Sequence, residues 1–135
     1  MSETAVSLSR LQTLAQARSK LDLLCQLRDR IEQRLDHAMA LAEKGGQTTL
    51  AVLDRNAEKL RTFADKSIRS QDQINRLAKR FQRVDRQVPD MANTGIDRQL
   101  ARALQILDKT ETLLEVELLE LDGIVEEIEG SARRN

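Results

Sequence analysis

The side chains that most often do chemistry in proteins are scarce in this chain. Its 135 residues include one histidine, one cysteine and two aromatic residues, Phe63 and Phe81. His37 follows Asp36 and could act as a general base, but no serine or cysteine lies at a helical spacing from His37 to act as its nucleophile. Cys25 falls at the edge of an apolar stripe, where cysteine is usually a small buried hydrophobe. We therefore expect no catalytic residue and a protein that is not an enzyme.

The sequence also lacks the ligand sets and motifs of common metal and cofactor sites. A single histidine and a single cysteine cannot provide the three or four protein ligands of a zinc site. The Glu-x-x-His spacing of carboxylate-bridged di-iron bundles does not occur. Gly45-Gly46 lacks the Lys-Ser/Thr pair and the further glycine of phosphate-binding loops. We expect no metal and no cofactor.

Two breaks divide an otherwise helical sequence. Gly45-Gly46 follows Glu43-Lys44, which is typical of a helix C-terminus. The second break contains Pro89, and Thr94 with Asp97 has the spacing of a capping box that starts a helix. The pattern predicts a single helical domain over 1–135, with three helices and a flexible tail at about 4–44, 48–87, 95–129 and 130–135.

Each predicted helix carries one apolar stripe at steps of three and four residues. In the first helix the stripe comprises Leu14, Ala17, Leu21, Leu24, Ile31, Leu35, Ala38 and Ala42. In the second it comprises Leu50, Leu53, Ala57, Leu60, Ala64, Ile74, Ala78 and Phe81. In the third it comprises Leu100, Ala103, Leu107, Leu114, Leu118, Leu121, Val125 and Ile128. Three stripes joined by two short connections predict an all-α, elongated up-down-up three-helix bundle with coiled-coil-type packing. Its proportions resemble those of spectrin-type three-helix repeats, a resemblance of geometry that implies no function.

Polar residues interrupt the stripes near the middle of the predicted bundle. They are Arg28, Ser67, Gln71 and Thr110. One interpretation is that Arg28 extends outward along the surface and Ser67 leaves room for it. The other is a buried polar layer that fixes the register of the helices.

The net charge of zero, from 22 basic and 22 acidic residues, hides an uneven distribution. From Arg69 to Arg86 there are six basic and two acidic residues, and Arg69, Arg76, Arg80 and Arg83 share one helical face. Eight acidic residues and no basic one lie between Thr110 and Gly130. In an up-down-up bundle these two segments lie at opposite ends, which predicts a positive and a negative pole.

Some apolar residues lie outside the stripes. Leu23, Leu27 and Leu41 are predicted to face away from the core, as are Val116 and Leu119. Clusters of this kind surrounded by charge indicate a second helix-packing surface. Gly123 interrupts the third helix, where it either begins a frayed tail or admits a partner backbone.

These features together favour a non-enzymatic interaction module, such as an adaptor or an assembly or secretion chaperone. It would bind a helical protein or itself through Leu23, Leu27, Val116 and Leu119, and through three arginines, Arg76, Arg80 and Arg83. Two alternatives stay open: nucleic-acid binding by the basic face, and a structural subunit of a filament or scaffold. No secretory signal or membrane-spanning run is evident, so we expect a cytoplasmic location, in keeping with the single cysteine.

Overall fold

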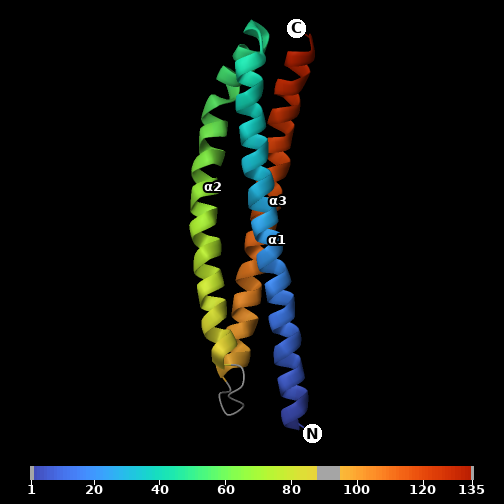
Figure 1. Ribbon diagram of the computed structural model, residues 1–135, viewed down its shortest axis with the longest axis vertical. Coiled ribbons are helices and arrows are strands. Elements are labelled where there is room, and N and C mark those ends of the chain that lie inside the picture. The colour runs from blue at the N-terminus through green and yellow to red at the C-terminus, as the bar shows by residue number, and fades with distance from the viewer. Residues whose placement is uncertain (1, 88–94, 135) are drawn as a thin grey trace.

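The computed structural model consists of three long helices packed side by side (Figure 1). They are α1 (Ser2–Lys44), α2 (Gln47–Gln87) and α3 (Gly95–Arg134). The structure describes residues 2–87 and 95–134, and their side chains over 8–87 and 95–133. The chain runs up α1, down α2 and up α3, so the predicted up-down-up three-helix bundle is confirmed. With about 40 residues in each helix, the bundle is roughly 60 Å long.

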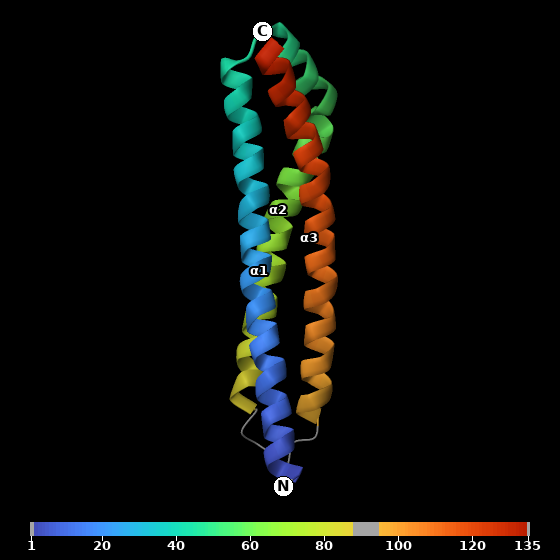
Figure 2. The same ribbon diagram turned by 90° about the vertical axis from the view of Figure 1, so that its right-hand side faces the viewer.

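The N-terminal end of α1 extends beyond the other two helices. Figure 2 shows this from the side, and Figure 1 shows the same extension from the front. The side chain of Arg10 near this end is almost fully buried, with 2% exposed, and its Nε lies 3.0 Å from the carboxylate of Asp97 on α3. Asp97 is the residue expected to complete a capping box with Thr94, which lies outside the described residues. Its carboxylate accepts hydrogen bonds from Arg10, which ties the start of α3 to α1.

The predicted stripes of α1 and α3 form the core. Every stripe residue of α3 is buried, and those of α1 are buried or half-buried. In α2 the prediction is only partly correct. Ile74 and Phe81 are buried, whereas Leu50 and Ala64 are exposed. The first half of α2 instead turns Thr49, Val52, Asn56 and Phe63 inward.

The final segment of the chain is helical, so the prediction of a flexible tail at 130–135 is wrong over its described part. Helix α3 continues to Arg134. Ile128 and Ser131 are buried, and the Ser131 hydroxyl lies 3.3 Å from the Thr49 hydroxyl at the start of α2. Packing against the first turn of α2 therefore holds the end of α3, and the interpretation of Gly123 as the beginning of a frayed tail is also wrong.

Gly123 is exposed on α3, and a Cβ added there meets no atom within 4 Å. Because alanine loses less backbone entropy than glycine in a helix, we expect Gly123→Ala to raise the free energy of unfolding by about 1 kcal/mol. Urea denaturation monitored by circular dichroism measures this change. A destabilised Gly123→Ala protein would mean that α3 does not continue through this position as a regular helix.

The predicted polar layer is not one network. The Arg28 side chain is 14% exposed, its Nε donates to the Ser67 carbonyl at 3.3 Å, and its guanidinium pairs with Glu32 at 3.0 Å. Gln71 bonds Asn75 on its own helix, and Thr110 accepts from Gln73 at 3.5 Å. Arg28 therefore extends outward across Ser67 to acidic residues of α1, as the first interpretation proposes.

Candidate interaction surface

The structure separates the apolar residues predicted to contact a partner into two groups. Val116 and Leu119 are exposed on α3, at 50% and 75% of their surfaces. Leu27, however, is buried, with 6% exposed, and Leu23 is half-buried against the core. The prediction that Leu23 and Leu27 face away from the core is wrong, because α1 packs against both α2 and α3 and a wider arc of its surface than one stripe is covered. Leu41, predicted to face outward with them, is half-buried as well.

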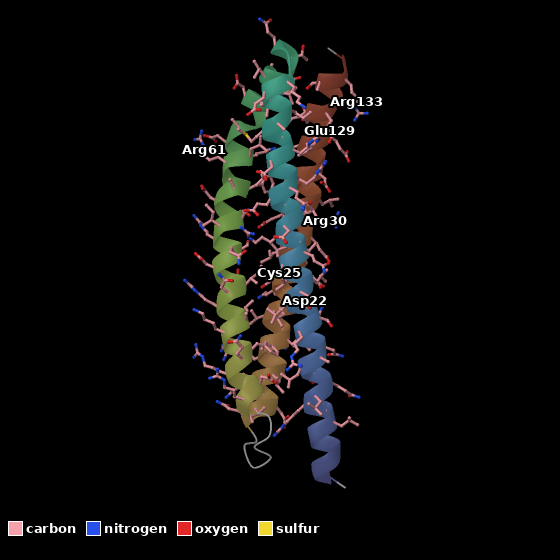
Figure 3. All side chains as sticks on the ribbon, viewed as in Figure 1. Asp22, Cys25, Arg30, Arg61, Glu129 and Arg133 are labelled. Atoms are coloured by element: carbon pink, nitrogen blue, oxygen red, sulfur yellow. The ribbon has the colours of Figure 1, made fainter. Side chains whose placement is uncertain are left out.

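Cys25 also differs from its expected environment. A small hydrophobe at the edge of the core was expected, but the side chain is exposed on α1 (Figure 3). It forms no disulfide, as expected for the only cysteine of the chain.

The basic face of α2 reaches solvent as predicted. Arg76, Arg80 and Arg83 are all exposed, and none of them forms an ion pair with a side chain that the structure describes. Both aromatic residues are buried, Phe63 with 6% and Phe81 with 5% exposed. The basic face therefore offers charge but no aromatic ring on which a base could stack.

Arginines of α1 and α2 partly neutralise the acidic end of α3, which was not predicted from the sequence. Asp122 lies 2.8 Å from Arg34, and Glu129 lies 3.4 Å from Arg34 and 3.0 Å from His37 (Figure 3 labels Glu129). Glu127 pairs with Arg55 of α2 at 2.6 Å. Of the eight acidic residues, those that form no ion pair within the described chain are Glu115, Glu117, Glu120 and Glu126.

These contacts align α1 with α3. Arg10–Asp97, Lys20–Glu111 and Arg34–Asp122 join residues that are 87, 91 and 88 positions apart. A nearly constant separation is what two helices running in the same direction require. The hydrogen bonds that the Lys20 ammonium donates to Asp108 and Glu111 raise the pKa of this lysine. Burial raises the pKa of Glu117. The positive charge of Lys66 lowers this pKa in part, and the negative charge of Glu120 raises it further.

An apolar groove of about 720 Å³ lies between the second half of α1 and the first half of α2. We refer to it as the α1/α2 groove. From α1 its apolar lining comprises Leu35, Ala38, Met39 and Ala42. From α2 it comprises Leu50, Leu53, Ala57, Leu60, Ala64 and Ile68. The most exposed of these side chains are Met39, Leu50 and Ile68, at 63%, 49% and 65%.

The groove exists because the first half of α2 has two apolar faces and α3 covers only one. Val52 and Phe63 are buried, while Leu50, Ala57 and Ala64, spaced seven residues apart, stay outside the core. On α1, Ala38 and Ala42 add small side chains next to Met39. Because small residues line the space between larger ones, the surface presents holes into which side chains of a further helix could pack.

Charged residues border the groove unevenly. Asp36 of α1 and Asp54 of α2 line it, and neither forms an ion pair with a described residue. Glu32 also lines the groove, at the end away from the Gly45-Gly46 turn, and it forms an ion pair with Arg28. Arg61 projects from α2 (Figure 3) and also forms no ion pair within the described chain.

Ser67 lines the same end of the groove as Arg28 and carries a buried, unsatisfied group. Its side chain is 5% exposed, and its hydroxyl has no hydrogen-bond partner among the described residues. Burying an unpaired hydroxyl is unfavourable. We expect Ser67→Ala to raise the free energy of unfolding by about 1 kcal/mol. Thermal denaturation of Ser67→Ala beside Ser70→Ala, whose hydroxyl donates to the Lys66 carbonyl, measures this difference. Equal losses of stability in both variants would contradict it.

The groove was not predicted from the sequence, although one signal for it is present. Val52 and Phe63 lie beside the stripe of Leu50, Leu53, Ala57, Leu60 and Ala64, and together they make an apolar surface wider than one neighbouring helix covers. That stripe was interpreted as core, and Met39 was not assigned to any surface.

Among the side chains described over 8–87 and 95–133, no three from His, Cys, Asp or Glu lie close enough together to hold a metal ion. None of the helices, over the same ranges, is both long and apolar enough to cross a bilayer. Comparison with protein families, curated proteins and solved structures finds no match for this chain.

Proposed function

We propose that this protein is a non-enzymatic helical interaction module of the adaptor or assembly-chaperone type, which binds a helical segment along the α1/α2 groove. The observation that carries this proposal is the groove itself, a long apolar hollow between the antiparallel helices α1 and α2. A groove between two helices is a common docking site for an amphipathic helix.

The proposal has a simple energetic basis. Met39, Leu50 and Ile68 each expose about half or more of their surface in the free protein. Fully burying a side chain of this size contributes roughly 1.5–3 kcal/mol, so covering the half that is exposed contributes roughly 1 kcal/mol each. The half-buried Leu35, Leu53 and Leu60 add to this when the groove is filled.

Val116 and Leu119 remain candidates for a second apolar contact, on α3. They are accompanied by Leu113, which is 59% exposed. We place the principal contact in the α1/α2 groove, where ten apolar side chains line one hollow.

Nucleic-acid binding by the basic face is the second candidate function. The exposed and unpaired Arg76, Arg80 and Arg83 favour it, because a row of arginines can neutralise phosphates. The burial of both phenylalanines disfavours single-stranded ligands, which are usually held by stacking on aromatic rings. Filter binding to mixed DNA and RNA, with Arg80→Glu and Arg83→Glu introduced together, tests this candidate.

Affinity purification from the native cell tests the principal proposal when it compares three forms of the protein. The wild type is compared with Met39→Glu/Ile68→Glu, which places charges in the groove, and with Leu119→Glu, which changes an equally exposed residue on α3. We expect a co-purifying protein that is lost with the groove variant and retained with Leu119→Glu. A protein whose co-purification is lost only with Leu119→Glu, or only with Arg80→Glu/Arg83→Glu, would contradict binding in the groove.

A further inference from the structure

We infer that the occupant of the α1/α2 groove is a basic amphipathic helix of another protein, about five turns long, with lysines or arginines beside its apolar stripe. This inference rests on the proposed function and adds the chemistry of the partner. Three properties of the groove support it: its length, its lining and the charges at its border.

The length of the groove sets the length of its occupant. On α2 the lining runs from Leu50 to Ile68. At about 1.5 Å for each residue this is roughly 27 Å of helix, and a helix of about 18 residues would fill it. A shorter occupant would leave either Leu50 or Ile68 exposed.

The shape of the lining favours large apolar side chains on the occupant. Ala38, Ala42, Ala57 and Ala64 leave space between the longer side chains of the two walls. Leucine, methionine or phenylalanine at steps of three and four residues would enter this space as knobs into holes. The buried hydroxyl of Ser67, which has no hydrogen-bond partner among the described residues, lies at the end of the groove away from the Gly45-Gly46 turn.

The charges at the border select a basic helix. Asp36 lies nine residues before Gly45, and Asp54 lies eight residues after Gly46, so the antiparallel arrangement places the two carboxylates at nearly the same height. Both line the groove and neither is paired with a described residue. The other acidic residue of the lining, Glu32, already has Arg28 as its partner. Only Arg61 contributes a positive charge, and it lies further from the turn.

A second copy of the chain fits this border less well. If two grooves faced each other with their chains parallel, Asp36 of one copy would lie near Asp54 of the other. If the chains were antiparallel and the grooves overlapped fully, Asp36 would lie near Asp36. Both arrangements bring unpaired carboxylates together, and such juxtaposed like charges disfavour association.

Two designed 18-residue peptides test the inference by fluorescence anisotropy with the full-length protein. They share one leucine stripe, and lysines flank it in the first peptide while glutamates flank it in the second. We expect the lysine peptide to bind about tenfold more tightly than the glutamate peptide. Asp36 and Asp54 attract the flanking lysines of the first peptide and repel the flanking glutamates of the second. In Asp36→Lys/Asp54→Lys protein the order of the two peptides should reverse.

The controls separate the partner's chemistry from the existence of the site. Met39→Glu/Ile68→Glu should weaken the binding of either peptide. Leu11→Glu changes a residue of α1 that is 54% exposed and does not line the groove, and it should weaken neither. If both peptides bind equally and only the groove variant weakens them, the groove binds helices but the inference of a basic partner is wrong. If neither peptide binds, both the inference and the proposed function are overturned. A dimer that Met39→Glu/Ile68→Glu converts to a monomer would show that a second copy occupies the groove, which also overturns the inference.

Discussion

Leu121→Ala is expected to lower the free energy of unfolding by about 3 kcal/mol. Leu121 is completely buried in α3, at the level where α3 packs against both other helices. Truncation to alanine removes the transfer free energy of the leucine side chain and leaves a cavity that long, stiff helices cannot readily close. Urea denaturation followed by circular dichroism gives the change, provided that wild type and variant unfold with the same dependence on urea.

Leu119→Ala is the matched control, since it removes the same atoms two residues away on the same helix. Leu119 is 75% exposed, so its truncation should change the free energy of unfolding by less than about 0.5 kcal/mol. Similar losses in the two variants would mean that the face of α3 assigned to the core is incorrect, and with it the arrangement of the bundle.

Gly45→Ala has the second largest expected effect, a loss of about 2 kcal/mol. A Cβ at Gly45 would overlap Cβ and Cγ2 of Thr49. Thr49 is fully buried and packs against Ser131 of α3, so it cannot move aside without disturbing the junction of all three helices. The amide of Gly45 donates to the Leu41 carbonyl at 2.8 Å, so the glycine continues the last turn of α1 and is tightly held.

Gly130→Ala provides the comparison for Gly45→Ala. A Cβ at Gly130 meets no atom within 4 Å, so its alanine variant should be at least as stable as the wild type. The two substitutions are chemically identical, and their melting temperatures should therefore shift in opposite directions. A Gly45→Ala protein as stable as the wild type would show that the connection between α1 and α2 is looser than the structure describes.

The three-helix architecture could be predicted because its signals are local. Gly45-Gly46 and Pro89 mark the two breaks, and the stripes of α1 and α3 have one clear apolar face each. Where the prediction was wrong, the outcome depended on contacts between helices. Leu27 is covered because α1 packs against both α2 and α3, and acidic residues of α3 form ion pairs with Arg34 and Arg55.

The α1/α2 groove could not be predicted from periodicity because two apolar faces overlap in the first half of α2. Which face α3 covers is decided by packing, and Phe63 and Val52 are the residues that it buries. The end of α3 shows the same dependence. Glycine at 123 and 130 is unfavourable in a helix, yet burial of Ile128 and Ser131 keeps the segment helical to Arg134.

The most direct test of the central claim, that the α1/α2 groove is the surface that binds a helix, is a nuclear magnetic resonance titration. The isotope-labelled full-length protein is titrated with the lysine-flanked peptide, and the shift of each backbone amide signal is recorded. We expect the largest shifts within 32–42 and 50–68, with small shifts elsewhere. Shifts concentrated within 69–86, or around Val116 and Leu119, with none along the groove, would contradict the claim.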